Sequence, residues 1–252
     1  MRKNNLKALI KDNKTVINGW LVHPSPLGAE LMAHQGYDVL TIDMQHGMIG
    51  FETALAMLQA ISTTPFTPLV RIPWLEPGII MKMLDAGAYG IICPMIETVE
   101  QAETFVAHCQ CPPKGNRSFG PTRAMVYGGS DYPDQAGDEI LPIVMIETRK
   151  ALDNLDDILS THGLGGVYIG PFDLSYALGC TPKADDFDTI VMEAIDHILD
   201  RAKYHKVPAA VHGIGHQFAA QMRAKGFNMV TAGCDAEFIR TGAADIIAAL
   251  KG

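Results

Sequence analysis

Polar and titratable side chains in this chain stand where short apolar runs end. Residues 39–42 form a β-branched run of the kind that makes a buried strand, and His46 and Gly47 follow soon after it. In parallel α/β folds, the carboxyl ends of the strands are where ligands bind and reactions take place. The side chains that close or follow such runs are Asp43, His46, Arg71, Glu147, Asp173 and His212.

Glu147 and Asp173 follow two successive runs, so we expect their carboxylates at one common mouth. Paired carboxylates suit a hard divalent cation with oxygen ligands, such as Mg²⁺ or Mn²⁺. They also suit a general acid and a general base, as in a glycosidase, or caps for the helices that follow them. The residue types alone leave these three interpretations open.

Arg71 and His212 each allow two interpretations. A buried arginine needs a partner, and for Arg71 this is either a structural carboxylate or an anionic oxygen of a substrate. His212, within Val-His-Gly at the end of a run, either lines a site or is an internally hydrogen-bonded polar group.

The elements that must position these residues alternate between strand and helix. Eight strand-like runs are predicted at 16–22, 39–42, 68–72, 90–93, 141–146, 166–169, 207–211 and 227–231. Helical patterns are predicted at 26–35, 51–61, 79–86, 99–108, 150–160, 187–205, 217–225 and 236–250, with a surface helix within 1–14 and an irregular piece over 111–138. Units of about 30 residues are typical of βα units, whose strands are parallel. Eight units in 252 residues predict an α/β fold, a single-domain (β/α)₈ TIM barrel over 1–252. An open doubly wound sheet is the second choice, because no Gly-x-Gly-x-x-Gly turn follows the first strand.

Composition argues against several classes of protein. The net charge is −8 and no basic stripe is present, so nucleic acid is not expected as a partner. No apolar run approaches the ~18 residues of a membrane span, so no membrane partner is expected. Five scattered cysteines without a secretion signal indicate reduced thiols and a cytoplasmic location.

The chain resembles the HpcH/HpaI aldolase family, the metal-dependent class II pyruvate aldolases, which include 4-hydroxy-2-oxoheptanedioate and 2-dehydro-3-deoxyglucarate aldolases. The resemblance covers about residues 18–252. Its motifs are Ile42-Asp-Met-Gln-His-Gly47, Leu69-Val-Arg71, Leu84-Asp-Ala-Gly87, Arg117-Ser-Phe-Gly120, Ile146-Glu-Thr148 and Ile169-Gly-Pro-Phe-Asp-Leu174. It implies a barrel of the phosphoenolpyruvate/pyruvate-binding type. It also implies a homo-oligomer, a hexamer, that exchanges a C-terminal helix at about 235–250 between subunits.

The resemblance implies a role for each matching residue. Glu147 and Asp173 are the expected ligands of a divalent metal, Mg²⁺, Mn²⁺ or Co²⁺, and no organic cofactor is expected. Arg71 is expected to hold the pyruvyl oxygen, His46 to act as the base, and Asp85 to orient His46. The pyruvyl carboxylate is expected on the turn Gly170, Pro171, Phe172 and Asp173.

Two positions depart from the family pattern. Relatives often carry Glu in place of Gln45 and Gln in place of Met145. Together with Phe119, Arg123 and His212, the departing residues Gln45 and Met145 are the expected lining on the acceptor side of the site.

These implications together predict a class II aldehyde-lyase. It would reversibly cleave 4-hydroxy-2-oxo acids to pyruvate or hydroxypyruvate plus an aldehyde, through an enolate whose charge the metal and Arg71 stabilise. A Schiff-base aldolase would need a lysine at the barrel mouth, and no lysine closes a strand here. The alternative is a decarboxylase or lyase that acts on oxaloacetate or a related hydroxy acid at the same site.

Overall fold

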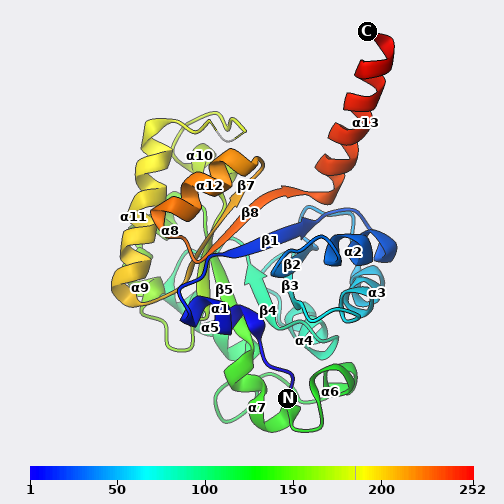
Figure 1. Ribbon diagram of the computed structural model, residues 1–252. Helices are drawn as coiled ribbons and strands as arrows, with labels where there is room; N and C mark the ends of the chain where they lie inside the picture. The colour runs from blue at the N-terminus through cyan, green and yellow to red at the C-terminus, as the bar shows by residue number, and fades with distance from the viewer. Residues whose placement is uncertain (185) are drawn as a thin grey trace.

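The protein is a closed barrel of eight parallel strands (Figure 1). The computed structural model describes residues 1–184 and 186–252. The strands pair in chain order and the last pairs with the first. They are β1 (Val16–Leu21), β2 (Val39–Asp43), β3 (Thr67–Arg71), β4 (Gly90–Cys93), β5 (Leu141–Ile146), β6 (Gly166–Ile169), β7 (Ala209–Gly213) and β8 (Met229–Cys234). The predicted (β/α)₈ fold is confirmed.

Most of the helices lie on the outside of the barrel, whereas the first closes its bottom and the last extends away from it. They are α1 (Asn5–Lys11), α2 (Pro26–Ala33), α3 (Phe51–Ile61), α4 (Pro77–Asp85), α5 (Val99–Cys109), α6 (Thr122–Gly128), α7 (Tyr132–Glu139), α8 (Arg149–Asp153), α9 (Leu155–Leu159), α10 (Pro171–Ala177), α11 (Thr189–His205), α12 (His216–Lys225) and α13 (Asp235–Lys251). The apolar faces of α2 to α12 and the outward faces of the strands form the larger of two buried apolar clusters. Amphipathic helices on a parallel sheet bury both of its faces in this way.

Side-chain caps set where several of these helices begin. Ser25, Glu76, Thr98 and Thr148 each accept a hydrogen bond from a main-chain N–H in the first turn of the helix that follows. Such a cap typically stabilises a helix by about 1 kcal/mol. These caps fix the start of α2, α4, α5 and α8, each of which follows directly on a loop at the mouth of the barrel.

The segment 111–138 is more ordered than the sequence indicates. It contains α6 and α7, where we expected irregular structure. The expected helix over 150–160 is divided into α8 and α9 at Asn154, which serves as the C-cap of one and the N-cap of the other. Both differences arise in short helices, which show too few turns for a hydrophobic period to be visible.

The N-terminal helix α1 closes the bottom of the barrel. Leu6 is 1% exposed and belongs to the inner cluster, with Trp20, Tyr168 and Met229. Asn4 caps α1 and also donates to the main-chain oxygens of Tyr89 and Glu139. The bottom is therefore filled, and the opposite end, where the strands finish, is the end that opens.

The last helix, α13, does not pack along its own barrel. It leaves β8 and extends away from the body of the molecule (Figure 1). Every residue from Phe238 to the end of the chain is exposed. Within the described residues, no helix is both long enough and apolar enough to cross a membrane.

Candidate active site

The loop after β2 is a tight turn built on Asp43. One carboxylate oxygen of Asp43 accepts the main-chain N–H groups of Gln45 at 3.0 Å and His46 at 3.3 Å. Side-chain turns of this type are a property of aspartate. A Cβ at Gly47 would lie 2.2 Å from the main-chain oxygen of Asp43, so only glycine fits. The turn leaves His46 exposed at the mouth.

Arg71, at the end of β3, pairs with Asp43 in a two-point contact. Its Nε lies 2.9 Å from Oδ1, and its Nη2 lies 2.5 Å from Oδ2. The indole N–H of Trp20 donates to Oδ2 at 3.2 Å, and the guanidinium lies 4.9 Å from the Trp20 ring centre. Nη1 is not engaged by Asp43 and lies 4.0 Å from the sulfur of Met145. The structural carboxylate, one of the two interpretations of Arg71, is therefore present, and Nη1 is the guanidinium nitrogen that Asp43 does not hold.

The charge of Asp43 depends on this pair. Burial alone would raise its pKa, but the hydrogen bond and charge of Arg71, with the two turn N–H groups, lower it below the usual value. Asp43 is 1% exposed, and it stays ionised because Arg71 compensates its charge. The pair is a fixed part of the barrel interior.

Glu147 follows β5 and is 2% exposed. Its Oε1 accepts the main-chain N–H of Met95 at 2.8 Å. Met95 has a φ of 56°, a left-handed conformation that is strained for a residue with a side chain. Burial, and then the nearby charge of Asp173, raise the pKa of Glu147 to about 7.

Asp173 lies in the first turn of α10 and is exposed. The turn that carries it begins at Gly170, the N-cap. A Cβ on Gly170 would lie 2.5 Å from Oε2 of Glu147 and 3.0 Å from the Met145 methyl group. The Glu147 carboxylate thus lies close to the Gly170 backbone, at the start of the helix that carries Asp173.

A hollow of about 320 Å³ opens among these residues, at the carboxyl ends of the strands. Its lining is His46, Arg71, Met145, Tyr168, Gly170, Pro171, Phe172, Asp173 and His212. The base, the arginine and the carboxylate-binding turn that we expected are therefore brought to one place, with two of the expected acceptor-side residues. Their roles remain predictions.

His212 is both a lining residue and a hydrogen-bonded one. Its Nδ1 lies 3.1 Å from the Tyr168 hydroxyl, which also contacts the Thr231 hydroxyl at 2.8 Å. Its ring meets that of Trp20 edge-on, with ring centres 4.8 Å apart. Burial above all, and then the charge of Arg71, lower its pKa to about 4. His212 is therefore a neutral imidazole at pH 7.

Several of the expected residues do not line this hollow. Asp85 pairs with Arg117 at 2.5 Å, so its expected action on His46 stays a prediction. Phe119 is 54% exposed and lines a separate cavity of about 180 Å³ that also contains Arg117. Arg123 donates to the main-chain oxygens of Ala86 and Leu58, which ties α6 to neighbouring helices. Gln45 keeps its side-chain oxygen buried without a hydrogen-bond partner in the described residues.

Two aromatic residues of the site were missed from sequence. Trp20 and Tyr168 lie within apolar strands and face the barrel interior, where they bond Asp43 and His212. The sequence did contain an indication, because the indole N–H of a buried Trp and the hydroxyl of a buried Tyr usually have a hydrogen-bond partner.

The carboxylates fit a divalent cation with oxygen ligands. Within residues 1–184 and 186–252, no three or more His, Cys, Asp or Glu side chains are grouped closely enough to hold a metal ion by themselves. Glu147 and Asp173 are hard oxygen donors of the kind that Mg²⁺ and Mn²⁺ prefer, and such cations usually keep several waters or substrate oxygens. The Oε2 of Glu147 faces the Gly170 backbone, on the side of α10.

The fold and this strand-end site are those of a (β/α)₈ barrel that handles small molecules at its carboxyl face. Residues 18–241 match the HpcH/HpaI aldolase/citrate lyase family. The chain belongs to that family.

Individual relatives cover nearly the whole chain. A hydroxypyruvate/pyruvate aldolase of Rhizorhabdus wittichii is 40% identical over 245 residues, which are 97% of this chain and 98% of that protein. A 5-keto-4-deoxy-D-glucarate aldolase of Shigella dysenteriae serotype 1 is 34% identical over 240 residues, 94% of this chain and 93% of that one. Among solved structures, an HpcH/HpaI aldolase/citrate lyase family protein from Burkholderia cenocepacia J2315 superposes with a TM-score of 0.93 at 28% identity, covering 99% of this chain and all of that one.

Proposed function

We propose that this protein is a divalent-metal-dependent aldolase that reversibly cleaves 4-hydroxy-2-oxo acids to pyruvate or hydroxypyruvate and an aldehyde. The observation that carries the proposal is the single hollow at the strand ends. It joins an exposed histidine, an arginine whose Nη1 is not held by Asp43 and has a weak sulfur contact with Met145, and the start of a helix, beside a buried carboxylate. The 40% identity to a hydroxypyruvate/pyruvate aldolase supports this choice of substrate class.

Glu147 and Asp173 would hold the cation, which we propose is Mg²⁺, Mn²⁺ or Co²⁺. A divalent cation supplies Lewis acidity that stabilises negative charge on the 2-oxo oxygen. We propose no organic cofactor, because the cation and Arg71 can together stabilise the negative charge of the enolate.

The protein's own residues bind and orient the substrate. The main-chain N–H groups in the first turn of α10, around Phe172 and Asp173, receive the pyruvyl carboxylate; among the described residues no side chain caps this turn. Nη1 of Arg71 donates to the 2-oxo oxygen, and its other two donor positions stay with Asp43, which fixes the direction of the guanidinium.

His46 takes the proton of the 4-hydroxyl group. The electrons of that O–H bond form the aldehyde C=O, the C3–C4 bond breaks, and its electrons pass through C2 onto the 2-oxo oxygen. The resulting enolate takes a proton at C3, which balances the proton that His46 removed and then releases, and leaves as the 2-oxo acid. A positioned base typically contributes about 10²–10⁴-fold. His46 is exposed at the mouth, so the released aldehyde has a direct way out.

A coupled assay tests the proposal. Pyruvate or hydroxypyruvate formed from a panel of 4-hydroxy-2-oxo acids is followed with a dehydrogenase and reduced nicotinamide cofactor. We expect turnover by the wild type and losses of at least about 10²-fold for Arg71→Ala and for His46→Asn. Wild-type rates in both variants would refute these roles. Turnover of oxaloacetate but of no hydroxy-oxo acid would favour the decarboxylase alternative.

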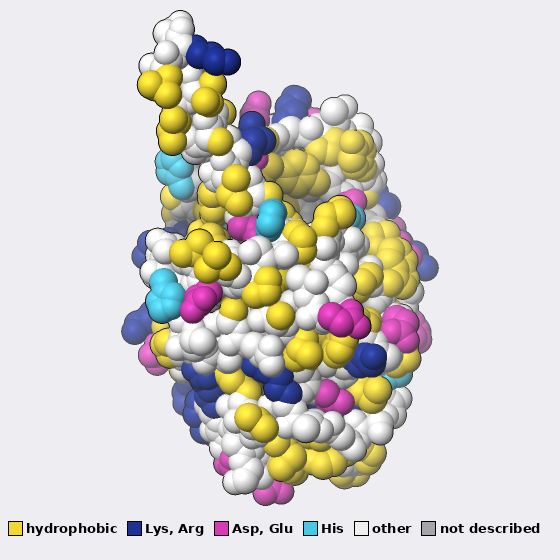
Figure 2. All heavy atoms as spheres, turned by 90° about the vertical axis from the view of Figure 1, so that its right-hand side faces the viewer, with side chains coloured by type: hydrophobic (Ala, Val, Ile, Leu, Met, Phe, Trp, Pro, Cys, Tyr) yellow, Lys and Arg dark blue, Asp and Glu magenta, His cyan; other side chains and the backbone are white. Residues whose placement is uncertain are grey.

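We also propose that the protein is a homo-oligomer, a hexamer, in which α13 is exchanged between subunits. Apolar side chains run along the projecting helix (Figure 2); Ile239, Ile246 and Leu250 are each more than 60% exposed. Apolar patches of this kind mark protein interfaces. Sedimentation analysis should show the full chain as an oligomer and a chain ending at residue 236 as smaller. A monomeric full-length chain would contradict the proposal.

A further inference from the structure

A second hollow, larger than the one at the proposed active site, lies elsewhere on the barrel. It has a volume of about 840 Å³, against about 320 Å³ at the strand ends. Leu141 begins β5, Gly165 precedes β6 and Pro208 lies just before β7, so this hollow is at the opposite, amino-terminal face of the barrel. Small-molecule sites typically occupy about 300–1,000 Å³. The reaction proposed above does not use it.

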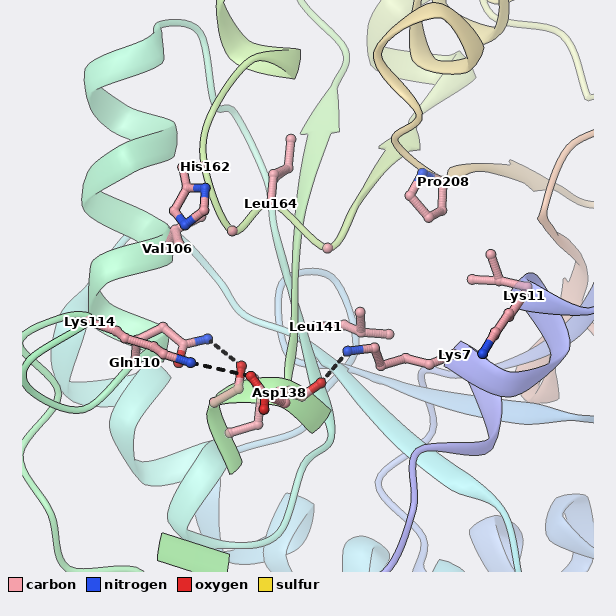
Figure 3. A pocket seen from close by; sticks show the side chains of 15 residues that line it. Lys7, Lys11, Val106, Gln110, Lys114, Asp138, Leu141, His162, Leu164 and Pro208 are labelled. Carbon is pink, nitrogen blue, oxygen red and sulfur yellow. Dashed lines mark hydrogen bonds and ion pairs between the residues drawn. The ribbon is translucent and has the colours of Figure 1, made fainter. Parts of the chain in front are cut away.

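The walls of the hollow are apolar. Val106 and Leu141 are buried, and Ile10, Leu164 and Pro208 are partly buried around them. Below Leu141 and Pro208 a small recess of about 20 Å³ continues to Leu6 and Met229 in the barrel bottom. Figure 3 shows Leu141 between the two sides of the hollow, with Leu164 and Pro208 on the strand-start loops.

The rim is positively charged in a chain whose net charge is −8. Lys7 and Lys11 come from α1 on one side, and Lys114 stands on the other (Figure 3). Lys114 already pairs with Asp138 at 3.3 Å, and Lys7 donates to the main-chain oxygen of Asp138. Asp138 is the one acidic residue in the lining.

Lys11 is the cation available to a ligand. It has no hydrogen bond or ion pair within residues 1–184 and 186–252, and it lies four residues after Lys7 on the same helix face. Like charges at this spacing repel, and an anion between or above them would remove the repulsion. The hollow thus offers an apolar wall with a positive rim.

We propose that this hollow binds a small amphipathic organic acid, with its carboxylate at Lys11 and Lys7 and its alkyl or aryl body against Leu141 and Leu164. The apolar wall favours a ligand with a hydrocarbon body over inorganic phosphate. Because this hollow and the strand-end hollow lie on opposite faces of the barrel, the bound acid and the enzyme's substrate do not compete. The site is therefore placed to hold an effector.

Octanoate is the probe for the test. 1-Octanol, which has the tail without the charge, and acetate, which has the charge without the tail, are the matched controls. Saturation-transfer NMR on the whole protein gives each dissociation constant, with and without saturating pyruvate and Mn²⁺. We expect octanoate to bind more tightly than either control, and pyruvate with Mn²⁺ not to displace it. Equal binding of octanol, or displacement by pyruvate, would overturn the proposal.

Two variants locate the site. Lys11→Glu reverses one charge on the rim and should weaken the binding of octanoate about fivefold. Lys14→Glu makes the same change just outside the lining and should leave the binding unchanged. Leu164→Asp should abolish binding by placing a carboxylate on the apolar wall. Equal weakening by Lys11→Glu and Lys14→Glu would assign octanoate to general charge attraction and refute the site. The readout is binding, so it is independent of whether the proposed aldolase activity is found.

Discussion

Asp43→Asn is the sharpest test of how the site is held together. The Asp43 carboxylate accepts five hydrogen bonds: two from Arg71, one from Trp20 and two from the main chain of Gln45 and His46. An asparagine keeps the shape but replaces one acceptor oxygen by an NH₂ donor. Whichever way the amide turns, that NH₂ faces N–H groups, and the charge of buried Arg71 loses its partner.

The expected cost follows from the burial of the pair. Arg71 is 9% exposed and Asp43 1%, and removing one partner of a buried ion pair typically costs about 3–5 kcal/mol. For a domain of this size each kcal/mol lowers Tm by about 2–4 °C, so we expect a decrease of roughly 6–20 °C. Because Arg71 and the His46 turn both lose their anchor, kcat should also decrease by at least about 10²-fold.

The assay combines urea unfolding with the coupled aldolase assay on the same preparation. Asp157→Asn, an exposed aspartate in α9, is the matched control and should change neither quantity. The reasoning would be refuted if the free energy of unfolding of Asp43→Asn lay within about 1 kcal/mol of the wild-type value and its kcat were unchanged, because an unpaired buried guanidinium should destabilise the fold by more than that.

The pH dependence of the same pair has a definite sign. The pKa of Asp43 is lowered in the folded state, so the unfolded chain takes up a proton first as the solution is acidified. The contribution of the pair is complete above the unfolded-state pKa of about 3.9 and is lost as the pH falls through the folded-state value. Asp43→Asn should therefore cost its full stability difference at pH 7, and this difference should begin to shrink as the pH falls below about 3.9. A difference that grew as the pH fell below that value would contradict this.

Three further changes test other parts of the site. Gly170→Ala places a methyl group 2.5 Å from the Glu147 carboxylate, so Mn²⁺ affinity, measured by titration of activity, should decrease about 10–100-fold; unchanged affinity would place the cation elsewhere. His212 has its pKa lowered from 6.5 to about 4, so unfolding free energy should decrease between pH 6.5 and 4 in the wild type and less in His212→Phe, and parallel profiles would contradict this. Glu147→Gln should abolish restoration of activity by metal while the circular dichroism stays that of the wild type.

The barrel could be predicted from the sequence because its strands are buried on both faces. Runs such as 39–42 and 166–169 then read as continuous apolar stretches, each followed by a polar residue at the mouth. Position at a strand end was enough to bring His46, Arg71 and Asp173 to one hollow.

Side-chain partners could not be predicted in the same way. The pairing of Arg71 with Asp43 depends on the register that sets these two residues side by side on β3 and β2, and the sequence does not state register. Asp85 stands on α4 and pairs with Arg117, a residue of the loop before α6, so the segment 111–138 decides its surroundings. For α13, an apolar face indicates burial against something, but not whether that is its own barrel.

The most direct measurement is pyruvate release from 4-hydroxy-2-oxo acids after treatment with EDTA, and again after addition of Mg²⁺, Mn²⁺ or Co²⁺, in the wild type and in Glu147→Gln. We predict that chelation abolishes the wild-type activity, that at least one of the cations restores it, and that none restores it in Glu147→Gln. Activity that is indifferent to EDTA in the wild type would contradict a metal-dependent aldolase with its cation on Glu147 and Asp173.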